Sequence, residues 1–212
     1  QSPITRMAKR SGSSSRWLQR QHKDLYVKQA QQSDYRSRAV YKLIEIDERD
    51  RLFQRGQTVV DLGAAPGSWS QFVASKIAPG GSVIAVDILP LQPLSNVFFI
   101  KGNFAENAVM QQCMIALGGA RADLVISDMA PNLSGIKASD QARCIALAEL
   151  ARDLALQVLK PGGDFLVKIV QGEGTQEFQS TLKERFQKVM LRKPKASRDS
   201  SSEIYLLGRS LR

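Results

Sequence analysis

The feature that most constrains this chain is a regular alternation of strand-like and helix-like segments that begins at residue 57. Short apolar runs rich in Val, Ile and Leu are typical of buried strands, and the longer stretches between them repeat apolar residues every three or four positions. This order predicts a doubly wound α/β sheet with ligand sites at the carboxyl ends of its strands. The expected strands are 58–62, 82–87, 97–100, 123–127, 164–170, 188–192 and 203–207, and the expected helices are 69–77, 105–117, 139–159 and 175–187.

The residues before this alternation differ in composition. Residues 1–15 are polar, rich in Ser and free of acidic side chains, which predicts a flexible basic arm. Residues 17–32 and 37–52 have the periodicity of amphipathic helices. No apolar stretch of a secretory signal is present in the arm, but a basic, Ser-rich start also suits a mitochondrial transit peptide, and this alternative stays open.

Charge is concentrated at the two ends of the sequence. Residues 1–56 carry 13 Lys and Arg against 6 Asp and Glu, residues 57–180 carry 8 against 11, and residues 181–212 carry 9 against 3. A net charge of +10 distributed in this way is the usual footprint of a protein that binds a polyanion such as RNA. The alternative is that the charge serves solubility alone.

Several classes of function are excluded by composition. The sequence is 43% hydrophobic with ordinary Gly and Pro content, which argues against global disorder, and it lacks the roughly 18 consecutive apolar residues of a membrane span. Cys113 and Cys144 form no CxxC pair, and His22 is the only histidine. We therefore expect no metal site, no catalytic histidine and no disulfide framework, which favours a reducing, cytoplasmic location.

A glycine-rich loop follows the first expected strand, in the sequence DLGAAPGSW. Gly63 and Gly67 allow a close approach of the backbone to a ligand, and Asp87 ends the next strand, where a carboxylate can bind ribose hydroxyls. These features fit either NAD or S-adenosylmethionine. A tight turn with packing glycines and a capping Asp is the structural alternative.

The details of the loop favour S-adenosylmethionine over NAD. A bound pyrophosphate needs free backbone N–H groups and small residues where the helix begins. Pro66 removes one such donor, Ser68 takes a position where glycine is usual, and the bulky Trp69 follows at once.

Five segments together resemble the FtsJ/RrmJ (RlmE) family of ribose 2′-O-methyltransferases that act on large-subunit ribosomal RNA. They are SRAVYKL, VVDLGAAPGSWSQ, SDMAPNLSG, FLVKIVQGEG and SSEIYLL, and they occur in the family's order. The resemblance covers nearly the whole chain, from about Ser11 to Gly208. The resemblance implies a class I, Rossmann-like α/β fold that uses S-adenosylmethionine, with a mostly parallel seven-stranded sheet and an antiparallel last strand. It implies one methyltransferase domain over residues 16–212, made of a helical, RNA-contacting extension (16–56) and a Rossmann-like core (57–212).

The resemblance also implies two sets of site residues. The catalytic set would be Lys42, Asp128, Lys168 and Glu203, and the cofactor contacts would be Gly67, Trp69, Asp87, Asn103 and Asp128. Asn103 departs from the family pattern, in which Asp is usual. Its side-chain carbonyl still offers an uncharged acceptor to an adenine amino group.

Lys168 is the best candidate for a general base. Methyl transfer to a ribose hydroxyl needs alignment of two substrates and removal of one weakly acidic proton. Burial of Lys168 next to the second ammonium of Lys42 would favour the neutral amine, whereas Asp128 would orient Lys168, and Glu203 would hold Lys42 or the ribose. Taken singly, each residue has an ordinary alternative as a solvated or ion-paired side chain at a strand end.

The sequence therefore predicts a monomeric enzyme that methylates the ribose 2′-hydroxyl of a uridine in large-subunit ribosomal RNA, without a membrane partner. Three alternatives remain: an RNA-binding ribosome-assembly factor with a methyltransferase-like fold, a ribose methyltransferase of transfer RNA or the messenger cap, and an NAD-dependent oxidoreductase. The four intact catalytic residue types argue against the first, and Pro66 and Trp69 argue against the last.

Overall fold

The computed structural model describes residues 34–197 and 201–212. The predicted basic arm (1–15) and the predicted helix 17–32 lie outside the described residues. The division of the chain into an arm, a helical extension and a core therefore stays a prediction. Across the part that the structure describes, no helix is both long enough and apolar enough to cross a membrane.

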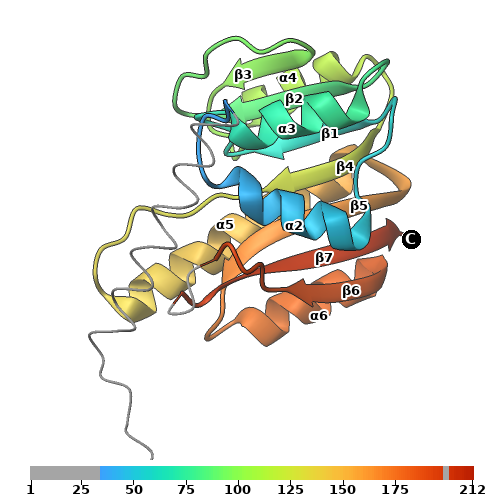
Figure 1. Cartoon of the computed structure of the whole chain (residues 1–212). Helices are drawn as coiled ribbons and strands as arrows, with labels where there is room; N and C mark the ends of the chain where they lie inside the picture. The colour runs from blue at the N-terminus through green and yellow to red at the C-terminus, as the bar shows by residue number, and fades with distance from the viewer. Residues whose placement is uncertain (1–33, 198–200) are drawn as a thin grey trace, which may run out of the picture.

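One seven-stranded sheet forms the centre of the molecule, with the strand order β3-β2-β1-β4-β5-β7-β6 (Figure 1). All neighbouring strands are parallel except that β7 runs antiparallel to both β5 and β6. The predicted fold, a mostly parallel seven-stranded sheet with an antiparallel last strand, is confirmed. The strands are β1 (Thr58–Leu62), β2 (Ser82–Asp87), β3 (Val97–Lys101), β4 (Ala122–Ser127), β5 (Leu159–Val170), β6 (Phe186–Arg192) and β7 (Glu203–Leu211).

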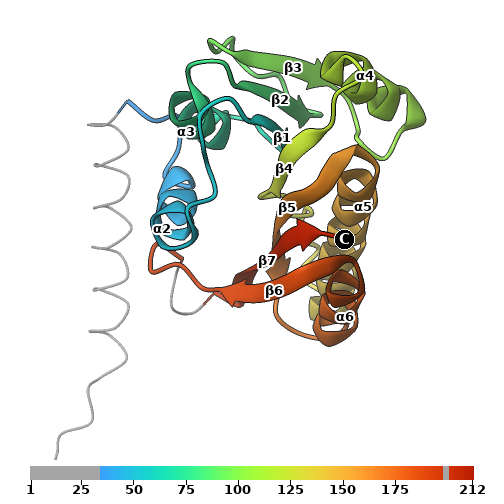
Figure 2. The same cartoon turned by 90° about the vertical axis from the view of Figure 1, so that its right-hand side faces the viewer.

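Helices cover both faces of this sheet, as Figure 2 shows in a view along its edge. One face carries α2 (Val40–Asp50) and α3 (Ser68–Ile77), and the other carries α4 (Asn107–Leu117), α5 (Lys137–Val158) and α6 (Thr175–Arg185). Each layer has its own hydrophobic core, because alternate strand residues point to opposite faces. The three-layer arrangement is what the strand–helix alternation predicted.

Several predicted element boundaries differ by a few residues from the observed ones, and two of these differences have a clear structural cause. Helix α6 ends at Arg185 rather than at residue 187, because Phe186 already lies in a strand, where its ring stacks on that of Phe165 in the core. Strand β5 begins directly after α5, at Leu159, but residues 160–163 bulge out of the ladder, since Ala122 pairs with Leu159 and Leu124 pairs with Asp164. The Lys-Pro-Gly-Gly sequence at residues 160–163 forms this bulge.

The topology gathers the polar strand ends at one edge of the sheet. Strands β1, β2 and β3 follow one another outward in one direction, and β4 and β5 in the other, so the strand order reverses between β1 and β4. Ligands in such sheets bind at the carboxyl ends beside this switch point. Because β7 is antiparallel, its first residue, Glu203, lies at the same edge and pairs with Val170 at the end of β5.

Candidate active site

Two lysines and two carboxylates meet at this edge. Lys42 donates a hydrogen bond to Glu203 Oε2 at 3.1 Å. Lys168 Nζ donates to the backbone carbonyl of Asp128 at 2.8 Å and lies 3.4 Å from Asp128 Oδ1 and 4.0 Å from Glu203 Oε1. The structure thus brings together all four residues of the expected catalytic set, and Glu203 lies between the two ammonium groups.

The direction of each side chain follows from strand alternation. Val167 and Ile169 pack into the core under α4, α5 and α6, so Lys168 between them points to the face covered by α2. Lys42 comes from the first turn of α2, on this same face. Four separate elements therefore contribute one residue each, which rules out any local sequence signal for the set as a whole.

The cluster is largely shielded from solvent. The Lys168 side chain is 9% exposed and the Lys42 side chain 15% exposed. Burial disfavours the ionised carboxylate of Glu203, but the charges of Lys42 and Lys168 and the hydrogen bond from Lys42 prevail, so the pKa of Glu203 lies below its ordinary value. Glu203 is therefore a carboxylate that fixes the position of both lysines.

Tyr205 is a fifth member of this cluster that the sequence analysis did not single out. It is fully buried, its ring packs against Trp69, and its hydroxyl donates a hydrogen bond to Asp128 Oδ1 at 2.5 Å. Burial, followed by the neighbouring charge of Asp128, raises the pKa of Tyr205 well above its ordinary value, so the phenol keeps its proton. The available signal was the spacing, because Tyr205 follows Glu203 by two positions and shares its face of β7.

The predicted cofactor loop connects β1 to α3 and is held by Asp87. One carboxylate oxygen of Asp87 accepts a hydrogen bond from the N–H of Ala65 at 2.8 Å, and the other accepts one from the N–H of Leu89 at 2.8 Å. Each carboxylate oxygen can accept more than one hydrogen bond. The side chain is therefore correctly placed at the end of β2 to hold the loop and also to bind ribose hydroxyls.

Neither glycine of the loop leaves room for a side chain, because other parts of the protein lie against both positions. Gly67 has a left-handed φ of +112°, and a Cβ there would lie 2.9 Å from Arg36 Nη1 and 3.1 Å from Leu91 Cδ1. A Cβ on Gly63 would collide with the side chain of Met129. Other parts of the chain thus lie close to both glycines, and the close approach of a ligand to the loop stays a prediction.

Trp69 lies in the core rather than in the loop. Its residue is 3% exposed, and its indole N–H donates to the carbonyl of Ala39 at 2.9 Å, which joins α3 to the start of α2. As the second residue of α3, Trp69 has a backbone N–H with no acceptor within the helix. The backbone N–H is the group that Trp69 can offer to a ligand, while the indole stabilises the wall of the site.

Acidic groups surround the loop. Asp61 on β1 is 1% exposed and accepts a hydrogen bond from Ser70 at 2.7 Å. Burial raises its pKa to about 7, and the negative charges of Asp128 and Asp87 contribute to this increase. Such surroundings attract a cation and repel a pyrophosphate, so the residues present fit S-adenosylmethionine, which carries a sulfonium and an ammonium, better than NAD.

Asn103 lies just after β3, at the same edge of the sheet, and is exposed. Its side-chain oxygen accepts a hydrogen bond from the N–H of Ala105 at 3.0 Å. A carbonyl oxygen has a second lone pair, which leaves room for the contact to an adenine amino group that the resemblance implied. Among the residues that the structure describes, no group of three or more His, Cys, Asp or Glu side chains is arranged to hold a metal ion.

Comparison with known proteins identifies the family of this chain. The model of the FtsJ-like methyltransferase family matches residues 35–211, which span every described helix and strand. The chain belongs to the FtsJ-like methyltransferase family. The resemblance seen in the sequence is thereby confirmed.

Relatives of this FtsJ-like chain extend over its whole length. The ribosomal RNA large subunit methyltransferase E of Azoarcus sp. is 54% identical over 96% of this chain and 100% of its own length. The protein of the same name from Pseudomonas aeruginosa is 54% identical over 96% of this chain and 98% of its own. A crystal structure described as a ribosomal RNA methyltransferase from Plasmodium falciparum has a TM-score of 0.77 at 30% identity, covering 84% of this chain and 98% of that one.

Several basic residues from the two positively charged ends of this FtsJ-like chain are bound within the protein. The Arg36 guanidinium donates to three backbone carbonyls, and Arg192 forms two 2.7 Å hydrogen bonds with the buried Asp50. Lys193 donates to the carbonyls of Ser201 and Glu203. Each of these cations has acceptors within the protein, which satisfy its hydrogen bonds without RNA. Lys195 is exposed and remains a candidate for phosphate contact.

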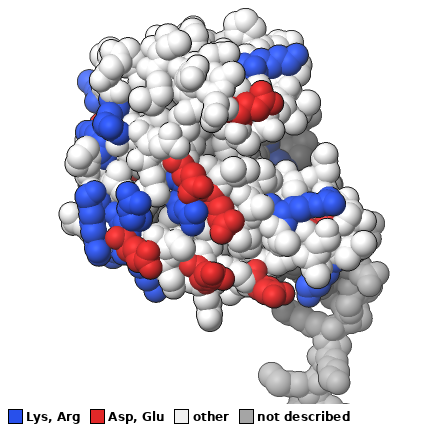
Figure 3. Space-filling view, turned by 180° about the vertical axis from the view of Figure 1, so that it is seen from behind, with Lys and Arg blue, Asp and Glu red and all other residues white. Residues whose placement is uncertain are grey.

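The face opposite to that of Figure 1 carries side chains of both charges (Figure 3). Blue and red side chains are intermingled over its lower half (Figure 3). Neighbouring charges of opposite sign largely cancel, so they give little net attraction for a polyanion. The edge where the four site residues lie is therefore the candidate surface for RNA contact.

Proposed function

We propose that this protein transfers a methyl group from S-adenosylmethionine to the ribose 2′-hydroxyl of a uridine in large-subunit ribosomal RNA. The observation that supports it best is the meeting of Lys42, Asp128, Lys168 and Glu203 from four different elements at the carboxyl edge of the sheet. The names of the relatives, which at 54% identity match over almost the whole chain, support the RNA class. The proposal includes a monomer of one methyltransferase domain, acting in the cytoplasm.

The cofactor would be held at the loop between β1 and α3. S-Adenosylmethionine supplies an activated methyl group when bound. Asp87 would accept hydrogen bonds from its ribose, Asn103 from its adenine amino group, and Asp128 and the loop backbone at Gly67 and Trp69 would complete the site.

The four residues would then act on the RNA hydroxyl. Lys168, as the neutral amine, would accept the proton of the 2′-hydroxyl while the oxygen forms its bond to the methyl carbon and the bond between that carbon and the donor sulfur breaks. The carbonyl and carboxylate of Asp128 hold Lys168 Nζ at a fixed position. Glu203 orients Lys42, whose ammonium would hold the substrate oxygen or phosphate next to Lys168.

Mapping of ribose methylations in ribosomal RNA tests this proposal. RNA from cells with and without the protein would be compared at every position of the large subunit. Loss of 2′-O-methylation at one uridine, restored by the intact protein and not by the Lys168→Ala variant, is the expected result. Unchanged methylation, with the protein still bound to ribosomal precursors, would favour an assembly factor, and loss of a transfer RNA or cap methylation would change the substrate class.

A further inference from the structure

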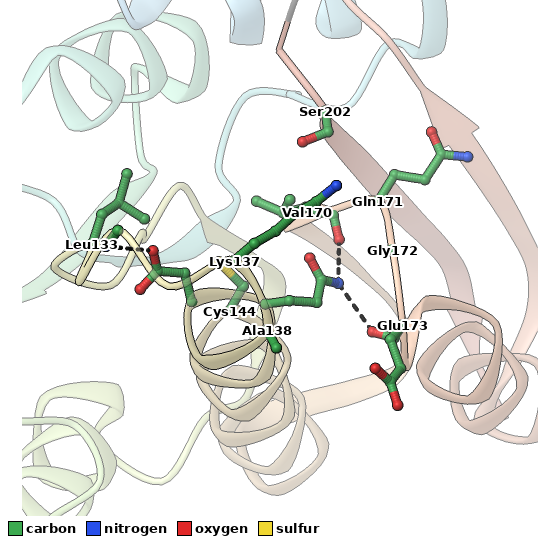
Figure 4. A pocket seen from close by; sticks show the side chains of 12 residues that line it. Leu133, Lys137, Ala138, Cys144, Val170, Gln171, Gly172, Glu173 and Ser202 are labelled. Carbon is green, nitrogen blue, oxygen red and sulfur yellow. Dashed lines mark hydrogen bonds between the residues drawn. The ribbon is translucent and has the colours of Figure 1, made fainter.

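A cavity of about 670 Å³ opens between the start of α5 and the turn that follows β5. This volume is within the range of about 300–1,000 Å³ that is usual for small-molecule sites. Figure 4 shows the side chains around it. Its wall includes Leu133, Lys137, Cys144, Val170, Gly172 and Ser202, none of which has a role in the site described above.

The cavity adjoins the cluster of Lys168 and Glu203. Ser202 lines it and directly precedes Glu203, and Val170 pairs with Glu203 across the β5–β7 ladder. Burial raises the pKa of the Cys144 thiol in the cavity wall, and the charges of Lys168 and Glu203 also act on it. A nucleotide with its ribose at Lys168 therefore has this cavity beside it as space for its base.

Gln141 presents a fixed hydrogen-bond acceptor to this cavity. Its Nε2 donates to the carbonyls of Val170 at 2.8 Å and Glu173 at 3.0 Å, the two bonds drawn from the amide in Figure 4. Both amide hydrogens are thus used, and a flipped amide would place its oxygen against two carbonyl oxygens. The orientation is therefore determined by chemistry, and Oε1 is left to accept a hydrogen bond from a ligand.

The surroundings hold this amide in place. A Cβ on Gly172 would lie 2.8 Å from the Gln141 amide carbon, so the amide rests directly on a glycine backbone. The neighbouring Asp140 accepts hydrogen bonds from the N–H groups of Ser134 and Gly135 and from the Ser134 hydroxyl, which ties down the loop next to Leu133. The cavity is therefore shaped before any ligand arrives.

These groups match the edge of one kind of base. Leu133 and Val170 offer apolar surface to the faces of a ring, and Lys137 offers a donor to a ring carbonyl. Uracil presents an N–H donor at N3 between two carbonyl oxygens, whereas cytosine has a lone pair at N3. The fixed acceptor Gln141 Oε1 therefore favours uracil, which donates from N3, and opposes cytosine, which has a lone pair there.

We infer that this cavity, the base pocket, receives the base of the nucleotide being methylated, turned out of its stack, and that Gln141 Oε1 accepts a hydrogen bond from uracil N3–H. This inference rests on the proposed function and specifies the substrate at the same site. Gln141 is thereby a specificity residue that contacts the base, and Lys168 is left to the ribose.

Single-turnover methylation of a short RNA that contains the mapped uridine tests the base pocket. With the full chain and saturating S-adenosylmethionine, Gln141→Leu should lower kcat/KM at least about tenfold and leave cofactor affinity unchanged. Gln157→Leu, an exposed position at the far end of α5, is the matched control and should have no effect. Replacing the target uridine by N3-methyluridine should lower kcat/KM of the wild type at least about tenfold. The same replacement should not lower kcat/KM of Gln141→Leu any further, because the two changes remove the same hydrogen bond.

A second pair of variants covers the case in which Gln141→Leu disturbs folding. Ala138→Phe fills the pocket from an exposed position in the first turn of α5, and Ala146→Phe adds the same ring elsewhere on the helix. Only the former should abolish methylation of the RNA. Full activity of Ala138→Phe, or equal use of uridine and N3-methyluridine by the wild type, would overturn the base pocket. Absence of any RNA methylation by the wild type would instead contradict the proposed function itself.

Discussion

The ammonium of Lys168 donates a 2.8 Å hydrogen bond to the backbone carbonyl of Asp128, whose carboxylate lies 3.4 Å away on the same residue. One residue therefore holds the lysine through two different groups, and a backbone carbonyl cannot be removed by substitution. Lys168 consequently has a fixed direction even in variants that lose the carboxylate.

If Lys168 is the base, Lys168→Ala should lower the single-turnover rate of methyl transfer by at least about 10²-fold while cofactor and RNA affinities change little. Lys168→Arg should not restore the rate, because guanidinium keeps its proton at any working pH. Near-normal turnover by Lys168→Arg would leave Lys168 as a positioning group.

Tyr205→Phe should lower kcat about tenfold with an unchanged KM for RNA, because Asp128 loses the donor that fixes its carboxylate. The ring itself, which packs on Trp69, is retained, so the fold should persist. The kcat and KM of the variant would be measured alongside its unfolding transition. An unchanged kcat would show that Lys168 alone suffices to hold Asp128.

Asp61 should make the stability of the protein fall as pH rises. The pKa of Asp61 in the folded protein is about 7, above the ordinary value of 3.8. Between these two pH values Asp61 ionises in the unfolded chain but stays protonated in the folded protein. The unfolding free energy therefore falls as pH rises, until pH passes about 7. Asp61→Asn removes this titration, and its gain in unfolding free energy should be larger at pH 8 than at pH 5 by on the order of 2 kcal/mol. Denaturant unfolding at both pH values measures this, with the exposed Asp153→Asn as control. Equal gains at the two pH values would contradict the raised pKa.

Asp87→Ala should weaken S-adenosylmethionine binding by about 1.5–3 kcal/mol, as expected for loss of a charged acceptor. Part of this loss would come from the loop, since Ala65 and Leu89 lose their acceptor as well. Calorimetry would compare the S-adenosylmethionine affinity of Asp87→Ala with that of Glu149→Ala, a control variant at an exposed acidic position on α5. Measurable NAD binding by the wild type would be inconsistent with the cofactor proposed here.

Lys195 and Arg192 should behave differently toward RNA, although both are basic and lie close in sequence. Lys195→Gln should flatten the log–log dependence of RNA affinity on salt by about 0.7–0.9, the effect of one phosphate contact. Arg192→Gln should instead lower the unfolding free energy by about 3–5 kcal/mol, because it leaves Asp50 buried without its partner. Filter binding over a salt series and denaturant unfolding separate the two effects. An unchanged slope for Lys195→Gln would assign this residue to solubility.

The sequence alone determined the order of elements and the sheet edge at which the site lies, and the resemblance to the family added the antiparallel last strand. The reason is physical: strand and helix periodicity is a local property, and parallel strands bring their carboxyl ends to one edge whatever the loops contain. Asp128 and Lys168 could be placed at that edge for this reason, and the motifs of the family added Lys42 and Glu203.

The tertiary structure decided which partner each side chain has. The Trp69 indole packs in the core and donates to the Ala39 carbonyl, Arg192 pairs with Asp50, and Tyr205, which was not singled out, holds Asp128. Each of these contacts joins residues at least 30 positions apart in sequence, for example the 77 positions between Asp128 and Tyr205. Periodicity gives the face of its element on which a side chain lies. Whether the side chain is buried, and which partner a buried polar group has, is decided only when distant segments pack together.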